Sequence, residues 1–207
     1  WTKNIGFPVI TVTENPETNE ITVRQNRYLT TGDVKPEEDT AIFPVFLGLK
    51  TKNGVDDSIV LDTREKTIKL LEDGLDFYKL NADQVGIYRT SYPESRWEKI
   101  GKAGSEGLLS VEDRAGLVAD AGALSTSGYQ STSSLLTLVN SWKNESNFVV
   151  WDEILTRVAA VKAAWIFEDK ATLEGLNAFT RSLVGEKTHA LGWDFKESDS
   201  FLEQKLK

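Results

Sequence analysis

Up to Pro93, hydrophobic residues gather in short runs rich in β-branched and aromatic side chains, and polar segments containing Gly, Pro or Asn separate these runs. Such a pattern predicts short strands divided by turns. We place them at Pro8–Val12, Ile21–Leu29, Ala41–Thr51, Ser58–Asp62 and Thr67–Leu71. Glu14–Glu20 has the composition of a turn, so the first two strands are predicted to form a hairpin. Strands this short, at this spacing, are typical of a small β-sandwich.

One more strand is predicted at Asp83–Pro93, with the sequence DQVGIYRTSYP. Side chains alternate between the two faces of a strand, so Ile87, Arg89 and Ser91 would share one face. Pro93 would end the strand, because proline has no amide hydrogen to offer a sheet. The lone guanidinium of Arg89 allows two interpretations. It could anchor a bound ligand, or it could make a structural contact where the sheets give way to another module.

After Pro93 the hydrophobic pattern takes the period of helices. A helix is predicted within Ser110–Gly128, because Ser110 and Asp113 have the spacing of a capping box and Gly128 has the position of a glycine that ends a helix. Further amphipathic helices are predicted at Thr132–Trp142, Phe148–Phe167, Lys170–Glu186 and Ser198–Lys207. Amphipathic helices joined by short polar loops are typical of an α-solenoid or helical array.

These patterns divide the chain into two modules. We predict a multi-domain fold of α and β type, with a β-sandwich domain over residues 1–93 and an all-α helical array over residues 94–207. The chain starts at Trp1 without a Met, and its last predicted helix reaches Lys207 without a stop signal. We therefore expect a piece of a longer protein, with the helical array cut short.

Composition narrows the classes of partner. With 24 Lys and Arg against 32 Asp and Glu, the net charge is −8, and phosphate backbones repel an acidic chain, so we predict no nucleic-acid partner. Hydrophobic runs stay well short of the roughly 18–20 residues that a membrane span needs, so no membrane association is predicted. Cys is absent, which excludes disulfides and thiolate ligands and fits a reducing compartment.

The chain is poor in residues that could form an active site. His189 is the only histidine, which leaves too few ligands for a catalytic zinc, and its place near a helix end predicts a capping or surface role. The acidic groups Asp56–Asp57 and Glu37–Asp39 lie in predicted turns, where solvation explains them better than acid–base catalysis. The sequence contains neither a phosphate-binding glycine motif nor a nucleophile elbow. We therefore predict no catalytic, metal-binding or cofactor-binding residue in this chain.

Tryptophans could form a platform for carbohydrate, but their positions favour packing. Trp142, Trp151 and Trp165 fall on helical patterns beside Leu, Val and Ala, so we expect them in the core. Trp97 follows the end of the last predicted strand by a few residues, so it is expected to pack at the junction of the two modules.

Four motifs, in order along nearly the whole chain, resemble the segment that follows the catalytic domain in zinc aminopeptidases of the gluzincin type. The first is WTKNIGFPVITV at Trp1–Val12. The others are a Q-x-R-aromatic strand (Gln25, Arg27, Tyr28), an N-x-x-x-x-G-x-Y-R-x-x-Y strand (Asn81, Gly86, Tyr88, Arg89, Tyr92) and a D-R-A-x-L-x-x-D-A helix (Asp113, Arg114, Ala115, Leu117, Asp120, Ala121). Within the family, the sequence is most similar to the puromycin-sensitive and fungal alanine/arginine aminopeptidase branch. One departure is Phe43, where many relatives carry Trp, and one aromatic residue in place of another leaves the fold assignment intact.

The resemblance implies a non-catalytic fragment of a zinc-dependent aminopeptidase that removes N-terminal residues from peptides. The fragment would comprise the third domain, a β-sandwich, and the first part of the C-terminal α-superhelical domain. The zinc ligands (two histidines and a glutamate) and the G-x-M-E-N loop would belong to the domain before Trp1. Zn is therefore expected in the parent enzyme and no cofactor in this chain. The implied partners are the catalytic domain of the same polypeptide and, in the parent, a peptide substrate, and the implied location is cytoplasmic.

On this interpretation the chain bridges the catalytic domain and the helical bowl that closes the substrate cavity. Arg89 would tie backbone carbonyls or an acidic partner across the module boundary through a bidentate contact, although contact with peptide stays open. The alternative for the whole chain is a free-standing β-sandwich and helical scaffold that binds an extended peptide or a carbohydrate. An H-E-x-x-H motif upstream in the reading frame would decide for the aminopeptidase, and a start codon at or just before Trp1 would decide for the scaffold.

Overall fold

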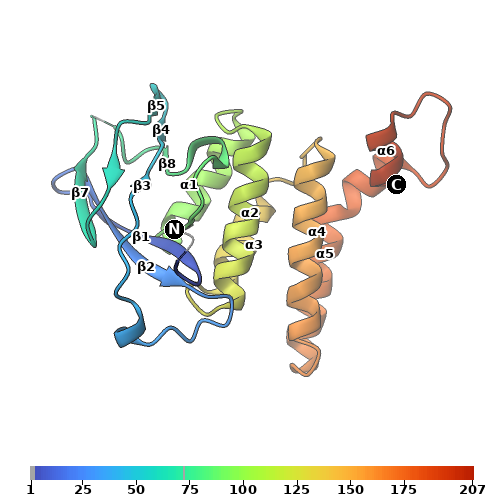
Figure 1. The fold of residues 1–207 in the computed structure, drawn as a ribbon. Helices are drawn as coiled ribbons and strands as arrows, with labels where there is room; N and C mark the ends of the chain where they lie inside the picture. The colour runs from blue at the N-terminus through green and yellow to red at the C-terminus, as the bar shows by residue number, and fades with distance from the viewer. Residues whose placement is uncertain (1–2, 72) are drawn as a thin grey trace.

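The computed structural model describes residues 3–71 and 73–207 of the chain. Strands come first and helices follow, and the two kinds of element lie at opposite ends of the molecule (Figure 1). The strands are β1 (Phe7–Asn15), β2 (Glu20–Tyr28), β3 (Val45–Phe46), β4 (Leu49–Thr51), β5 (Gly54–Asp56), β6 (Val60–Leu61), β7 (Glu65–Lys69), β8 (Tyr78–Lys79) and β9 (Arg89–Ser91). The helices are α1 (Glu94–Ser105), α2 (Val111–Thr126), α3 (Thr132–Asn140), α4 (Phe148–Ala164), α5 (Lys170–Leu191) and α6 (Phe201–Leu206). The predicted fold class, a β-module followed by a helical array, is confirmed. Trp1, with which the first motif begins, lies outside the described residues.

In the described ranges the strands form three sheets. The largest has the order β7–β2–β1–β9, and β1 and β2 are the predicted hairpin, antiparallel with Val12 opposite Val23. Strand β9 returns from far along the chain to lie parallel to β1, with Ile10 opposite Thr90. The smaller sheets are β3–β6 and β5–β4–β8. Strand β9 therefore joins the N-terminal hairpin directly to the segment that leads into the helices.

The prediction of one strand over Ala41–Thr51 is wrong. The segment divides into β3 and β4, which belong to different sheets. Gly48 lies between them with a φ of +50°, a left-handed conformation that glycine adopts without strain. The predicted turn that follows contains another strand, β5, which is antiparallel to β4. Hydrophobicity could not reveal the break, because the residues on both sides of Gly48 are apolar.

The predicted strand Asp83–Pro93 is also too long, because only Arg89–Ser91 is extended and paired. Before it, Ala82–Gln84 forms a 3-10 turn, and Asp83 and Gln84 have left-handed backbone conformations with φ of 54° and 55°. A chain that turns left-handed at consecutive residues leaves the β region and cannot continue a strand. Within the paired strand Arg89 is partly exposed, and Thr90 and Ser91 are both buried, so burial does not separate the two predicted faces.

Helix α1, which directly follows Pro93, was not predicted as an element. Gly101 and Gly104 lower its helix propensity, so its sequence pattern is weak. Packing explains both glycines. A Cβ on Gly101 would lie 2.4 Å from the hydroxyl oxygen of Ser141, and one on Gly104 would lie 2.5 Å from the indole nitrogen of Trp142. The two glycines let the segment after α3 approach the backbone of α1.

The other helices begin and end close to the predicted residues. Ser110 accepts a hydrogen bond from the Asp113 amide, the Asp113 carboxylate accepts one from the Ser110 amide, and the predicted capping box of α2 is thereby confirmed. Gly128 follows the C-cap of α2 with a φ of +77°, as predicted. Helix α5 extends beyond the predicted Glu186, so His189 lies in its last turn.

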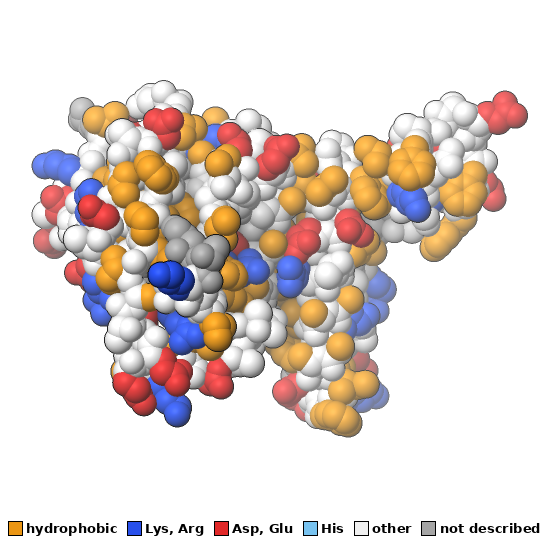
Figure 2. Space-filling view, in the orientation of Figure 1, with side chains coloured by type: hydrophobic (Ala, Val, Ile, Leu, Met, Phe, Trp, Pro, Cys, Tyr) orange, Lys and Arg blue, Asp and Glu red, His pale blue; other side chains and the backbone are white. Residues whose placement is uncertain are grey.

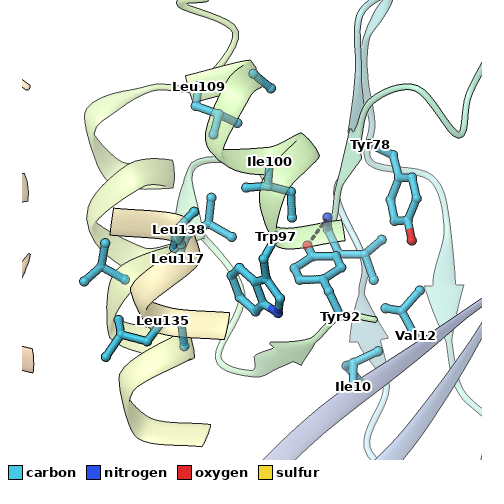
Figure 3. Packing of buried hydrophobic residues seen from close by; sticks show 14 of the residues in the cluster. Ile10, Val12, Tyr78, Tyr92, Trp97, Ile100, Leu109, Leu117, Leu135 and Leu138 are labelled. Atoms are coloured by element: carbon cyan, nitrogen blue, oxygen red, sulfur yellow. Dashed lines mark hydrogen bonds between the residues drawn. The ribbon is translucent and has the colours of Figure 1, made fainter. Parts of the chain in front are cut away.

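Most buried hydrophobic residues of the sheets and of the helices form one large cluster, and a second, small cluster joins Val9 and Tyr28 to Ala123 and Leu124 of α2. Figure 3 shows Ile10 and Val12 of β1 near Tyr92 and Trp97, which in turn face the leucines of α2 and α3. The rings of Tyr92 and Trp97 meet edge to face with centroids 5.3 Å apart, and Trp97 is fully buried. The predicted packing of Trp97 at the junction is confirmed.

The three tryptophans that were expected in the helical core, Trp142, Trp151 and Trp165, pack against it. Trp142 and Trp151 are buried, and each indole donates its hydrogen bond to a backbone carbonyl, that of Gly101 at 2.9 Å and that of Glu145 at 2.8 Å. Trp165 is partly buried against the same cluster. Burial of the ring with a satisfied N–H is the usual arrangement of a core tryptophan.

The far end of the helical array is much less buried. Of the 22 residues in α5, all within the described ranges, Leu176 and Leu183 alone are buried. Large apolar side chains are instead exposed around α6, among them Trp193, Phe195 and Phe201. Figure 2 shows hydrophobic side chains on the surface at the end of the molecule that carries α6. The core that positions the family motifs therefore lies between the sheets and helices α1 to α4.

Candidate functional site

The described residues offer no metal centre. In the parts of the chain that the structure describes, no group of three or more His, Asp or Glu side chains is placed to hold a metal ion. His189, the only histidine of the sequence, lies in the last turn of α5. The predicted lack of catalytic and cofactor-binding residues stays a prediction.

Arg89 links strand β9 to helix α2. Its Nη1 donates to the Asp120 carboxylate at 2.8 Å and to the Ala119 carbonyl at 3.5 Å. The guanidinium also lies over the rings of Phe7 and Tyr28, 5.7 and 5.3 Å from their centroids, at distances typical of cation–π contacts. The predicted pairing across the module boundary is confirmed.

The predicted bidentate geometry of this contact is wrong. Nη1 makes both hydrogen bonds, and Nε has no hydrogen-bond partner among the described residues. The guanidinium contacts the helix through one nitrogen while it lies over the two aromatic rings. The position of the rings could not be inferred from sequence, because Phe7 and Tyr28 come from the distant β1–β2 hairpin.

Asp120 is the buried acceptor of this junction. One oxygen faces Arg89 and the other accepts from the Thr90 amide at 3.2 Å. Burial raises the pKa of Asp120 to about 6, although Arg89 and the Thr90 amide favour the charged form. A carboxyl group this buried needs both partners to stay ionised near neutral pH.

A second buried ion-pair cluster surrounds Asp113 in the first turn of α2. Asp113 is fully buried, and its two oxygens contact the ammonium groups of Lys79, at 2.8 Å, and of Lys50. Burial alone would raise the pKa of Asp113, but the two lysines outweigh it and lower the pKa below its usual range. Lys79 is itself buried, and burial lowers the pKa of its ammonium against the opposing effect of Asp113. Helix α2 is thus tied to strands β4 and β8.

The N-x-x-x-x-G-x-Y-R-x-x-Y motif forms a braced loop. The Asn81 side chain bonds both backbone groups of Gly86, accepting from the amide at 2.7 Å and donating to the carbonyl at 3.0 Å. The Tyr88 hydroxyl donates to the Leu47 carbonyl at 2.6 Å, and the Tyr92 hydroxyl accepts from the Leu80 amide at 2.8 Å. These side chains replace the ladder hydrogen bonds that a strand would have supplied.

The remaining motif residues also join distant segments. Gln25 of β2 bonds both backbone groups of Phe43, donating to its carbonyl at 3.0 Å and accepting from its amide at 2.8 Å. Arg114 of α2 pairs with Glu145, its Nε 2.6 Å from the carboxylate, ahead of α4. The charged residues of the motif helix therefore contact the sheets on one side and the segment before α4 on the other.

An apolar hollow, which was not predicted from the sequence, opens beside this braced loop. Its volume is about 700 Å³, and Phe46, Val55, Val85 and Ile87 border it with exposed side chains. Asp57 and Asp83 add carboxylates to its lining. The one signal in the sequence was the pair Val85 and Ile87, two β-branched residues within a polar, glycine-containing stretch.

Comparison with known proteins gives one family and a set of fungal relatives. A family described as the ERAP1-like C-terminal domain matches residues 77–207. The chain is 61% identical over all 207 residues to "Aminopeptidase 2" of Candida albicans and 56% identical to "Aminopeptidase 2, mitochondrial" of Saccharomyces cerevisiae. It is 50% identical to "Alanine/arginine aminopeptidase" of Saccharomyces cerevisiae. Each match covers 100% of this chain but only 22%, 21% and 24% of the relative, so the chain spans less than a quarter of the length of these relatives.

Among the described helices, none is long and apolar enough to cross a membrane.

Proposed function

Because the chain belongs to the ERAP1-like C-terminal domain family of the M1 aminopeptidases, we propose that it is a non-catalytic part of a zinc-dependent enzyme that removes N-terminal residues from peptides. In the parent enzyme this part bridges the catalytic domain and the helices that close the substrate cavity. Both the catalytic domain of the same polypeptide and a peptide substrate are then its partners.

The observation that supports this proposal is the set of ion pairs that the motif residues of α2 form. Asp113, Arg114 and Asp120 lie on one helix and hold it to the sheets and to the segment before α4. The pairs of Asp113 and Asp120 fix the helices against the sheets, and the pair of Arg114 fixes α2 within the helical array. A bridge between domains needs that rigidity. A part that performed chemistry would instead require ionisable side chains converging on an open site.

Zinc does not fit the residues of this chain. A catalytic zinc in proteins takes three ligands, most often from His and acidic side chains, and leaves a position for water. This chain has one histidine and no cysteine, and the described acidic residues form no such cluster. We therefore assign zinc to another part of the parent enzyme and derive no step of the reaction for this chain.

We also propose a cytoplasmic location for the parent enzyme. The absence of cysteine fits a reducing compartment. The printed name of one relative describes that relative as mitochondrial. Cell fractionation with a tag on the complete protein would separate the two locations, and recovery in the mitochondrial fraction would contradict the proposal.

The complete reading frame tests the proposed function. We expect it to encode an H-E-x-x-H motif before Trp1, and the purified full-length protein to hold one zinc and to cleave aminoacyl-nitroanilide substrates. The 207-residue chain alone should neither retain zinc in metal analysis nor cleave these substrates. One tightly held zinc per 207-residue chain would contradict the assignment.

The bridging role needs its own experiment in the full-length enzyme. Asp120→Asn should lower kcat/KM without reducing zinc content, because the variant loosens the junction and leaves the metal site intact. Glu112→Gln is the matched control, because Glu112 is an exposed acidic residue of the same helix, and it should leave kcat/KM unchanged. Equal kinetics for Asp120→Asn and the control would contradict a bridging role. A start codon just before Trp1, with peptide or carbohydrate binding by the 207-residue chain, would favour the scaffold alternative instead.

A further inference from the structure

The apolar hollow beside the motif loop is held open by a rigid backbone. Asn81, Asp83 and Gln84 all have left-handed conformations, which cost more for Gln than for Asn or Asp. The Asp83 amide donates to the buried carboxylate of Asp113 at 2.7 Å, and the Asn81 and Ala82 amides donate to the carbonyls of Leu47 and Gly48. Strain of this kind persists only where the surroundings over-determine it, and it concentrates at functional sites.

Helix α2 adds a second restraint on this loop. The Gln84 side chain lies so close to Gly116 of α2 that a Cβ there would come within 1.9 Å of its amide nitrogen. The glycine therefore leaves the space into which Gln84 packs. With the loop fixed on both sides, the backbone that carries Val85 and Ile87 has a defined position before anything binds.

The loop presents apolar side chains to solvent. Val85 is 84% exposed and Ile87 is 71% exposed, and Phe46 faces the same hollow from β3 at 67% exposure. On the face shown in Figure 2, hydrophobic and acidic side chains lie side by side over the region of β3 to β5. Single exposed apolar residues are common on protein surfaces, but a contiguous group with a polar rim marks an interaction site.

The shape of the hollow fits a macromolecular surface better than a small ligand. A ligand pocket encloses most of its occupant and directs a few polar groups toward it. Here the bordering side chains are themselves largely in solvent, and the polar groups, Asp57 and Asp83, stand among them as a rim. An apolar centre with a charged rim is the anatomy of a protein interface.

We propose that this hollow is the docking surface for another domain of the same polypeptide, an inference that rests on the proposed function. The partner surface presents apolar side chains to Phe46, Val85 and Ile87, with Lys or Arg opposite Asp57, because Lys50 already pairs with Asp83. The chain spans less than a quarter of the length of its fungal relatives, so most of a parent of that length lies outside these residues.

The size of the surface favours a tethered partner over a free one. The hollow is lined by 12 residues, whereas a stable interface between separate proteins uses about 20–30 residues on each side. A domain on the same chain has an effective concentration of the order of millimolar, so a smaller surface holds it. A second copy of the chain or a free peptide would have no such advantage.

A photo-crosslinker at Val85 in the full-length protein tests the proposal. Irradiation should join this position to a residue outside the 207-residue segment, within a monomer that electrophoresis and mass spectrometry identify. Val149 is the matched control, because it is an exposed valine of α4 away from the hollow, and a crosslinker there should not reach the same partner residues. Crosslinks solely between two copies, or none from Val85, would overturn the proposal.

A crosslinker is larger than valine, so a second measurement uses the unmodified full-length protein. Hydroxyl-radical footprinting should modify Phe46 several-fold more slowly than in the variant V85D/I87D, in which charge prevents docking. Equal modification of Phe46 in both proteins would show an open hollow and overturn the proposal, as would protection that appears only with added peptide or only in dimers. Zinc content and aminopeptidase activity are read separately, so a full-length protein without them refutes the proposed function while Phe46 still reports on docking.

Discussion

Helices α2 and α5 differ sharply in what holds them. All residues of both helices are described by the structure. Helix α2 buries eight of its 16 residues, including two carboxylates that pair with the sheets, whereas α5 buries two of its 22 residues. The first is tied to strands on one side and to α3 and α4 on the other, and the second rests on α4 with its outer face open. Amphipathic patterning alone produces a helix, but position in the fold comes from partners on both sides.

The contrast predicts unequal stability along one chain. Local opening free energies range from near zero to the global value, and they are lowest where buried apolar contacts are few. The motif-bearing region, from β1 to α4, should therefore unfold as one unit. The α5–α6 end should open before it.

Hydrogen exchange should show the largest difference between α2 and α5. Amide protection in the 207-residue chain should fall by orders of magnitude from α2 to the helices beyond Lys170, since opening α5 exposes little buried surface. Mass spectrometry of peptides from α2 and α5 gives the ratio directly. Uniform protection up to Lys207 would contradict the division of the chain into two regions.

Removal of the Asp113 carboxylate should have the next largest effect. Asp113→Ala leaves the buried ammonium of Lys79 without its ion pair, which should lower the free energy of unfolding by roughly 3–5 kcal/mol. A urea titration measures the change. Glu112→Ala is the control, because Glu112 lies in the same helical turn but is exposed. If Asp113→Ala lowers the free energy of unfolding as little as Glu112→Ala does, the cluster is unimportant for stability.

Protonation of Asp120 should give a smaller, pH-dependent effect. The pKa of Asp120 rises from 3.8 to about 6 on folding, so between these values the folded state holds a proton that the unfolded state has released. Stability from this group is therefore greatest below pH 4 and falls as pH rises through 6, by roughly 1–3 kcal/mol at about 1.4 kcal/mol per pKa unit.

Other buried carboxyl groups, such as Asp113, have lowered pKa values and act in the opposite direction. The effect must therefore be read as the difference between the parent chain and Asp120→Asn at each pH. The difference should change between pH 4 and pH 7. Parallel stability curves for the two proteins would contradict the raised pKa of Asp120.

The sequence predicted those features that depend on local pattern. The β1–β2 hairpin, the capping box of α2 and the burial of Trp97 each follow from turn composition, cap spacing or hydrophobic period within a few residues. Helix α1 could not be predicted in this way. Its glycines are explained by the close approach of Ser141 and Trp142, which lie far along the chain.

The site was harder to predict than the fold. The motif residues were identified by their order, and the charge of Arg89 indicated an acidic or carbonyl partner. The partner itself, Asp120, and the rings that orient the guanidinium come from three separate elements. The apolar hollow depends on left-handed turns at Asp83 and Gln84, which no local pattern specified.

A double-mutant cycle on Arg89 and Asp120, measured by denaturant titration of the 207-residue chain, tests directly whether this pair joins the sheets to the helices. Arg89→Ala should lower the free energy of unfolding by roughly 1–3 kcal/mol, because the buried Asp120 carboxylate loses a charged donor. Arg89→Lys should recover part of this loss, since an ammonium can reach the carboxylate but cannot stack over two rings. In the Asp120→Asn background the effect of Arg89→Ala should shrink, which shows coupling between the two side chains. If Arg89→Ala instead unfolds at the same midpoint and with the same slope as the parent chain, the central claim that this pair joins the sheets to the helices is wrong.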